Sequence, residues 1–467
     1  MQLQFLGAAR QVTGSQYYLK TNGTKILIDC GMFQERDFLA RNWAALPIRP
    51  RDVDAVLLTH AHVDHCGLLP KLVEEGFRGS ILATPPTIEL VELVLRDSAQ
   101  IQAEDAEFKK KRHRKEGRAG QYPERPLYTL RDVERTVGLL KSVAYDQPVR
   151  ITPQLSATFR DAGHILGSAM IELVVQENDV SRRLIFSGDM GRAGRPFVHD
   201  PTRFTQTDDL VIESTYGDRT HENHGRVETQ LAEVITETVH AGGKVIVPIF
   251  AIERAQELIY YLGRLVRAGR IPSLPVYLDS PMAARVNEIF RRHRDAFSPE
   301  MKRQLDAGDG LLSFAGLKTI QTVEQSKALN HKKEPAVIMA TNGMCTAGRI
   351  KHHLAQYIDH PECTILFVGY QAAGTLGRLL LDGRKEVRLH GRYRMVRARI
   401  EHIAGFSGHA DRGELLDWLR HFVSPPEQVF VTHGEEEAAM ALAQQIRDEL
   451  HWNVTVPEYQ QVVELGP

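Results

Sequence analysis

The amino-acid sequence predicts an α/β protein in which a doubly wound parallel unit is inserted into a strand-rich framework. The chain has 467 residues, more than one ordinary core of about 100–200 residues holds, which favours two domains or one core with a large insertion. Strands dominate the first 213 residues, strands alternate with helices from residue 240, and polar clusters at strand ends return after residue 395. This order favours an insertion, with boundaries at 1–213, 214–395 and 396–467.

The first part is predicted from short β-type runs that are closed by turn residues. In chain order the runs lie at residues 2–7 (QLQFLG), 17–20 (YYLK), 25–31 (KILIDCG) and 54–62 (DAVLLTHAH). An amphipathic helix is predicted to begin at residue 85. The segment after it, up to residue 126, is rich in charged residues and then in Gly and Pro. Residues 155–175 then predict a strand, a turn and a strand, and residues 182–191 and 209–219 each predict a strand that runs into polar turn residues.

The inserted part is predicted from four strand-then-helix pairs. Apolar runs at 244–250, 275–280, 336–348 and 363–374 are each followed by a segment with helical spacing, at 253–269, 282–294, 349–358 and 375–381. Such alternation is typical of a parallel, doubly wound α/β unit. Residues 398–411 and 427–437 return to polar clusters at strand ends and complete the framework.

The composition gives no general sign of a polyanion-binding or membrane protein. Lys+Arg 58 against Asp+Glu 59 leaves a formal net charge of -1, so an interaction with nucleic acid must depend on local charge. No apolar run approaches the roughly 18 residues of a membrane helix, and the N-terminus lacks a signal-peptide pattern. Four scattered cysteines without CxxC spacing favour a reduced compartment. We therefore expect a cytoplasmic protein with no membrane partner.

The densest cluster of chemical side chains is the HxHxDH sequence at the end of an apolar run. His60, His62, Asp64 and His65 fall within six residues, and imidazole and carboxylate are ligands for zinc or manganese. On an extended chain His60 and His62 point the same way, whereas Asp64 and His65 lie past the turn. Because one metal cannot easily take all four, two metals are the natural solution.

Two metals need further ligands, and the sequence offers them where other strands end beside a glycine. These residues are His164 in DAGHILGS, Asp189 in FSGDMG and His433 in VTHGE. Any one of them alone is more simply explained as an ordinary turn residue, whereas the HxHxDH cluster is hard to explain without a metal.

The HxHxDH cluster, with the later GH, SGD and HG elements, resembles the metallo-β-lactamase superfamily of αββα-sandwich hydrolases over nearly the whole chain. The resemblance implies that an αββα sandwich forms the framework around the inserted unit. It also places Asp29, in LIDCG, where the family has an aspartate that supports the metal cluster from behind its ligands. The superfamily includes lactam hydrolases, thioesterases, flavoproteins and nucleases, so it does not fix the substrate.

Three further motifs look like those of the β-CASP nucleases, a branch that includes cleavage-and-polyadenylation endonucleases. They are VIESTYGDR with Glu213, FSGHAD with His409 and VTHGE with His433. A histidine in the third motif resembles the RNA-cleaving members. Residues 248–259, 340–349 and 369–378 are similar to the inserted domain of compact bacterial and archaeal ribonucleases, except that Glu253 replaces their usual glycine before Arg254.

The resemblance implies a site with two Zn²⁺, with Mn²⁺ as an alternative. His60, His62 and His164 would hold one metal, Asp64, His65 and His433 the other, and Asp189 would bridge them. A metal-bridging hydroxide would attack phosphorus, and His409, oriented by Glu213, would protonate the leaving 3′ oxygen. The catalytic residues are thus expected to be Asp64, Asp189, Glu213 and His409, and the products 5′-phosphates and 3′-hydroxyls. A structural role for Glu213 and His409 at a domain junction is the alternative.

Two glycine-rich turns, at 342–349 and 369–378, follow apolar strands and open helices, an arrangement that can cradle phosphate. Arg219, Arg254, Arg349 and Arg378 are the candidates for binding substrate phosphates. The basic run at 109–118 is more typical of a solvated helix end than of a nucleic-acid surface.

The sequence therefore predicts a zinc-dependent ribonuclease that acts on single-stranded RNA, with internal cleavage as the expected mode. A 5′-to-3′ exoribonuclease and a DNA nuclease are the nearest alternatives. A thioesterase or lactam hydrolase would not need the insertion, and a non-catalytic scaffold would show broken ligand positions. The oligomeric state, a homodimer included, and other RNA-processing partners stay open.

Overall fold

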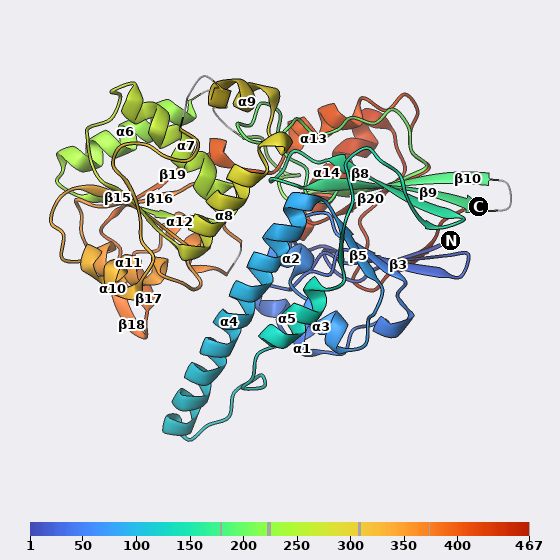
Figure 1. The fold of residues 1–467 in the computed structure, drawn as a ribbon, viewed down its shortest axis with the longest axis horizontal. Helices are drawn as coiled ribbons and strands as arrows, with labels where there is room; N and C mark the ends of the chain where they lie inside the picture. The colour runs from blue at the N-terminus through green and yellow to red at the C-terminus, as the bar shows by residue number, and fades with distance from the viewer. Residues whose placement is uncertain (178–179, 222–225, 307–309, 373, 467) are drawn as a thin grey trace. The chain divides into compact units, whose positions relative to one another are not determined.

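The computed structural model describes residues 1–177, 180–221, 226–306, 310–372 and 374–466. The chain divides into two compact units (Figure 1), of which unit 1 comprises Met1–Thr220 and His409–Pro467 and unit 2 comprises His221–Gly408. Unit 1 is thus built from both ends of the chain, and unit 2 is inserted into it. The boundaries that the sequence suggests, after residues 213 and 395, remain a prediction.

Unit 1 contains two seven-stranded mixed sheets. The first has the order β22 (Val462–Glu464), β1 (Gln2–Phe5), β2 (Tyr17–Thr21), β3 (Thr24–Ile28), β4 (Ala55–Leu57), β5 (Ser80–Ala83) and β6 (Leu140–Ser142). The second has the order β21 (Val454–Thr455), β20 (Gln428–Thr432), β11 (Asp209–Glu213), β10 (Val180–Phe186), β9 (Ala169–Glu177), β8 (Leu155–Asp161) and β7 (Val149–Thr152). Each sheet therefore includes a strand or strands from the C-terminal part of the chain.

The main core of unit 1 lies between the two sheets. Leu19 and Ile28 of the first sheet and Ile171 and Phe186 of the second belong to one buried cluster. A further cluster joins the outer face of the second sheet to α13 (Arg412–Leu419) and α14 (Glu436–Leu450). On the first-sheet side lie α2 (Val63–Cys66), α3 (Leu69–Glu74), α4 (Pro85–Glu116) and α5 (Leu130–Val137). Helix α4 contacts α2, α5 and β6, and α3 contacts α5. Helices thus cover two stacked sheets, and α1 (Ala40–Trp43) completes the unit.

Unit 2 is a doubly wound parallel α/β unit. Its six-stranded sheet has the order β14 (Leu317–Thr319), β13 (Val276–Asp279), β15 (Ala336–Ala340), β12 (Lys244–Pro248), β16 (Thr364–Phe367) and β19 (Arg399–His402), and every pairing is parallel. Its helices are α6 (Val227–His240), α7 (Arg254–Arg267), α8 (Pro281–Arg292), α9 (Pro299–Asp306), α10 (Val323–Leu329), α11 (Ile350–Tyr357) and α12 (Leu376–Leu381). A separate hairpin consists of β17 (Glu386–Leu389) and β18 (Arg392–Met395).

The α/β fold class, with a parallel unit inserted into a two-sheet framework, is thus confirmed. The near-continuous apolar strands of unit 2 are buried, as expected for a parallel sheet flanked by helices. Across the described ranges, no helix is both long and apolar enough to cross a bilayer.

Candidate metal centre

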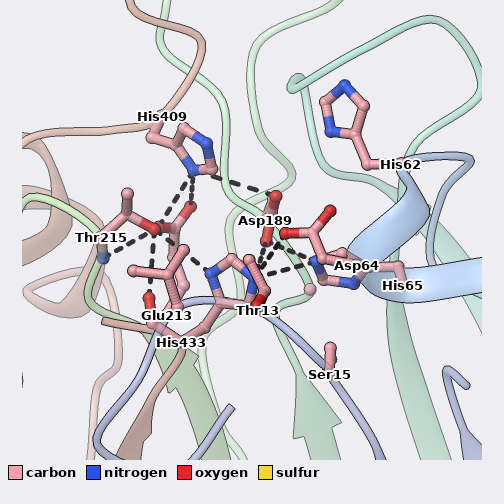
Figure 2. A network of polar contacts seen from close by, with 12 residues as sticks. Thr13, Ser15, His62, Asp64, His65, Asp189, Glu213, Thr215, His409 and His433 are labelled. Atoms are coloured by element: carbon pink, nitrogen blue, oxygen red, sulfur yellow. Dashed lines mark hydrogen bonds and ion pairs between the residues drawn. The ribbon is translucent and has the colours of Figure 1, made fainter. Parts of the chain in front are cut away.

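The predicted metal-binding side chains of unit 1 meet where strands of both sheets end. In the second sheet β10, β11 and β20 run parallel side by side, so Asp189, Glu213 and His433, which end or follow them, meet at one edge. His60 and His62 follow β4 of the first sheet, and Asp64 and His65 lie on the short helix α2. His164 lies in the turn between β8 and β9. Figure 2 labels His62, Asp64, His65, Asp189 and His433 among these side chains, together with Glu213 and other neighbours.

The first donor group consists of His60, His62, His164 and one carboxylate oxygen of Asp189. The distance from His62 Nδ1 is 3.0 Å to His60 Nε2 and 3.3 Å to His164 Nε2. Asp189 Oδ2 lies 3.4 Å from the Nε2 atoms of both His60 and His164. Four potential ligand atoms therefore face a common point.

The second donor group consists of Asp64, His65 and His433, and the other oxygen of Asp189 faces it. The Nε2 atoms of His65 and His433 lie 3.0 Å apart, and Asp189 Oδ1 lies 3.1 Å and 3.4 Å from them. Asp64 Oδ2 lies 3.7 Å from His433 Nε2. Asp189 therefore presents one oxygen to each donor group.

The spacing within each donor group is compatible with zinc. Zinc–nitrogen bonds of about 2.0–2.1 Å in a tetrahedron place neighbouring ligand atoms roughly 3.3 Å apart, close to the spacing within both groups. Asp189 Oδ1 is buried and accepts no hydrogen bond, which would cost roughly 1–3 kcal/mol without another partner. A cation between the histidine nitrogens would supply that partner.

Burial and charge set the protonation of the first donor group in a direction that suits a metal. Burial lowers the pKa of His60 to about 3 and that of His62 to about 4, so both rings are neutral, the form that binds metal. Burial also lowers the pKa of His164. Burial would raise the pKa of Asp189, yet the surrounding histidines, His433 foremost, hold it well below its usual range. The bridging carboxylate is therefore ionised.

Asp29 lies behind the donors rather than among them. Its Oδ2 accepts a hydrogen bond of 2.6 Å from His65 Nδ1, and its Oδ1 accepts one of 2.8 Å from the backbone N–H of Thr59. These contacts leave His65 Nε2 free to face the centre. The backbone at Gly31 lies directly against the backbone of Asp64. A Cβ at Gly31 would lie 1.6 Å from the carbonyl oxygen of Asp64, so only glycine fits at this position.

Two threonines that the sequence analysis overlooked orient donor rings. Thr59 Oγ1 lies 3.0 Å from both Asp29 oxygens and 3.1 Å from His60 Nδ1. Thr215 Oγ1 lies 3.2 Å from His433 Nδ1. A partner on Nδ1 fixes the tautomer that presents Nε2 to a metal. Thr59 directly precedes HxHxDH and Thr215 lies two residues after Glu213, and this closeness in the sequence is the signal that could have identified them.

Glu213 and His409 form a pair beside the donors. His409 Nδ1 lies 3.1 Å and 3.2 Å from the two oxygens of Glu213 and 3.9 Å from Asp189 Oδ2. Glu213 Oε1 also accepts a hydrogen bond from the backbone N–H of Met190. Burial would lower the pKa of His409, but the carboxylates of Glu213 and Asp189 raise it above its ordinary value, which favours a charged ring.

Helix α13 fixes the position of His409. Its N-terminal residue Asp411 forms a capping box with Glu414, in which the carboxylate of each accepts the backbone N–H of the other at 2.9 Å. Glu414 also pairs with Arg192 at 3.1 Å. Since His409 precedes Asp411 by two residues, the capped helix holds it beside Glu213.

The four arginines predicted to bind phosphate all have acidic partners in the structure. Arg219 pairs with Asp218 at 2.7 Å, Arg349 with Asp279 at 2.6 Å and Arg378 with Asp382 at 2.8 Å, and Arg254 pairs with Glu257. Arg254 is also buried, so its guanidinium could reach a phosphate only by leaving Glu257. Their phosphate-binding role remains a prediction.

The glycine-rich turns lie where the sequence placed them, in unit 2. Residues 342–349 join β15 to α11, and residues 369–378 join β16 to the start of α12, with residue 373 outside the described residues. Gln371 Nε2 donates a hydrogen bond of 2.9 Å to the carbonyl of Gly343 and links the two turns. The basic run at 109–118 forms the exposed end of α4 and the turn after it.

Comparison with known families matches most of the chain. Residues 9–231 match the metallo-β-lactamase superfamily, residues 255–380 match the β-CASP domain, and residues 393–457 match the Zn-dependent metallo-hydrolase RNA specificity domain. The first match extends past residue 213, and the second begins at residue 255.

Two curated relatives are similar along nearly the whole chain. Ribonuclease TTHA0252 of Thermus thermophilus is 40% identical over 95% of this chain and 95% of its own length. Transcription termination factor FttA of Methanocaldococcus jannaschii is 34% identical over 96% of this chain and 69% of its own length. Among solved structures, a protein of unknown function from Enterococcus faecalis aligns over 99% of both chains with a TM-score of 0.55 and 11% identity, a likeness of fold alone.

Proposed function

This chain belongs to the metallo-β-lactamase superfamily, in the branch with β-CASP and RNA-specificity domains, and we propose that it cleaves single-stranded RNA internally. The resemblance drawn from its motifs is confirmed by these matches. It is a metal-dependent hydrolase of the ribonuclease class, and zinc is the metal of its family. The finer statements on ligands, mechanism and cleavage mode are our proposal.

The observation that carries the proposal is the position of Asp189 between two histidine-rich donor groups. We assign His60, His62 and His164 to one zinc ion, Asp64, His65 and His433 to the other, and Asp189 to both. Asp29 acts through His65, which it holds by the 2.6 Å hydrogen bond. Two zinc ions bound here would supply a water deprotonated near neutral pH and would neutralise charge on phosphoryl oxygens. Manganese suits the carboxylate ligands as an alternative.

We assign the protonation of the leaving group to His409. The 3′ oxygen that leaves phosphorus needs a proton, and a charged imidazole beside the donors can supply it. Glu213 orients this ring through Nδ1, so Nε2 remains to face the substrate. Because water rather than the ribose hydroxyl attacks, the products carry a 5′-phosphate and a 3′-hydroxyl.

Cleavage of a closed circular RNA tests this proposal directly. A single-stranded circle has no 5′ end, so an enzyme that linearises it cuts internally, whereas an exonuclease leaves it intact. We expect the zinc-loaded protein to linearise circular RNA and to leave circular single-stranded DNA intact. The new 5′ ends should accept a label from a kinase only after phosphatase treatment, because they already carry phosphate.

An Asp64→Ala variant is the matched control, because it removes one ligand of the second donor group and should be inactive. Activity on linear RNA alone, with release of mononucleotides, would shift the assignment to a 5′ exonuclease. Cleavage of the DNA circle would favour a DNA nuclease. If neither RNA were cleaved by the wild type, the ribonuclease proposal would fail, and thioester and lactam substrates would come next.

A further inference from the structure

A basic hairpin in unit 2 carries a local positive charge that the site described above does not use. We use the name basic hairpin for residues 384–397, which comprise β17, β18 and their flanks. The segment contains one acidic residue, Glu386, and six basic ones, Arg384, Lys385, Arg388, Arg392, Arg394 and Arg397. In a chain with a formal net charge of -1, this is a local excess of positive charge of the kind that attracts a polyanion.

The basic hairpin packs one face on the core of unit 2 and turns the other face outward. Val387 and Leu389 are buried in the core of unit 2, where they pack in one cluster with Leu354 and Leu380 of α11 and α12. The turn at His390 and Gly391 has φ values of 47° and 81°, which suit a tight two-residue hairpin. Figure 1 shows β17 and β18 at the edge of unit 2, next to α11.

The outward face places an aromatic ring directly opposite an arginine. The antiparallel register pairs Arg388 with Tyr393 and Glu386 with Met395. Because alternate residues of a strand share a face, Arg388, Tyr393 and Met395 lie together with Glu386 on the side away from Val387. Tyr393 is 68% exposed and Met395 48% exposed, although burial is the usual state of such side chains.

Two exposed arginines of the basic hairpin are available for a ligand. Arg388 lies on the outward face, and Arg392 lies next to the turn, where the register pairs it with Leu389 on the other face. Within the described ranges, neither Arg388 nor Arg392 forms an ion pair with a carboxylate, and the one side-chain hydrogen bond of Arg388 is a long contact of 3.4 Å to the carbonyl of Gly391. The four arginines first expected to bind phosphate are all paired with acids. The basic hairpin therefore offers guanidinium donors that need not give up a partner first.

We propose that the basic hairpin binds single-stranded RNA, with a base stacked on Tyr393 and backbone phosphates on Arg388 and Arg392. The inference rests on the proposed function, for which it supplies a substrate-binding surface outside the metal centre. Exposed aromatic rings beside cations are the means by which proteins hold unpaired bases and their phosphates. A duplex cannot offer an unstacked base, and an acidic protein segment would use the arginines without needing the tyrosine ring.

The test is the binding of a fluorescent single-stranded RNA to the full chain, followed by anisotropy across a range of salt concentrations. The Asp64→Ala background prevents cleavage during the measurement. Tyr393→Ala should weaken binding about 5- to 100-fold, the range of one lost stacking interaction, whereas Tyr393→Phe should keep wild-type affinity. Arg388→Gln with Arg392→Gln should lower the slope of log K against log salt by about 1.4, the value for two phosphates of a single strand.

The matched control removes the same charge from other exposed positions of unit 2, Arg291→Gln with Arg303→Gln, and should leave affinity unchanged. A duplex of the same sequence should not respond to Tyr393→Ala. Unchanged single-strand affinity in the hairpin variants would overturn the proposal, as would an arginine effect without a tyrosine effect, which would point to an acidic protein partner. Because binding is measured without turnover, failure of the basic hairpin and failure of the ribonuclease proposal can be told apart.

Discussion

At the scale of single residues, the centre depends on side chains that never touch a metal. Glu213 is buried and holds His409, and its charge makes a positively charged ring favourable. An amide at this position keeps the shape and loses the charge. A Glu213→Gln substitution therefore tests the charge of the pair separately from its geometry.

For Glu213→Gln we expect the rate of RNA cleavage to fall by about 10²- to 10⁴-fold, the usual contribution of a general acid. Zinc content should stay at the wild-type value, since Glu213 lies outside both donor groups proposed to bind zinc. Single-turnover cleavage and metal analysis measure the two effects. An exposed glutamate of the same unit, changed in Glu437→Gln, is the control, and an unchanged rate in Glu213→Gln would leave the pair with a structural role only.

Thr59 offers a second test, because its hydroxyl joins Asp29 to His60. Thr59→Val keeps the volume but removes the hydroxyl, and we expect zinc affinity to fall about 10- to 100-fold, as is typical when a partner of a ligand is lost. Thr59→Ser should restore most of it. Competition with a chelator of known affinity gives the measurement, and equal affinity in the valine and serine variants would contradict the assigned role.

At the scale of elements, the backbone conformation at the start of α7 bears on the unusual residue Glu253. Glu253 stands where relatives of this type usually have glycine, and its φ is 66° with ψ at -55°. This backbone conformation strains every residue with a Cβ. The glycine preference at this position therefore has a conformational cause, whatever Arg254 contacts.

Alanine usually stabilises a helix more than glycine does, and we expect the reverse order of stability at position 253. Glu253→Gly should be more stable than Glu253→Ala by about 1–2 kcal/mol, because glycine adopts positive φ without strain. Both variants lose the same side-chain contacts, so their difference isolates the backbone. Urea unfolding measures it, and an alanine variant as stable as the glycine variant would show that the backbone relaxes when Glu253 is removed.

The element scale also shows what the sequence could and could not predict. The apolar runs with polar ends identified β4, β10, β11 and β20 and the residues that follow them, because burial and turn chemistry are local. The order in which strands pair is not local. That β20, near residue 430, lies beside β11 and so brings His433 to Asp189 follows from the fold of the whole unit. The acidic partner of Arg349 was likewise invisible, because Asp279 lies 70 residues away in the chain.

At the scale of the whole molecule, the donors tie together segments that are remote in the chain. They come from residues 60–65, 164, 189 and 433 of unit 1, whereas none of the proposed ligands lies in unit 2. Metal binding should therefore stabilise one unit selectively.

We expect a strong chelator to abolish RNA cleavage and to lower the melting temperature of unit 1, because a ligand that binds only the folded state stabilises it. Zinc should restore both properties. Differential scanning calorimetry follows the transitions, and hydrogen exchange shows which unit loosens. Equal loosening of unit 2, or no change in melting temperature, would contradict the assignment of the metals to unit 1 alone.

The contribution of His433 also has a consequence for protein synthesis. The second donor group joins Asp64 and His65 to a residue that the ribosome adds 369 positions after Asp64. A nascent chain that has not yet passed residue 433 lacks one side of the pocket, however well its earlier strands have folded. A truncated copy that ends before residue 433 would therefore lack one of the ligands that we propose, and it should be inactive as a nuclease.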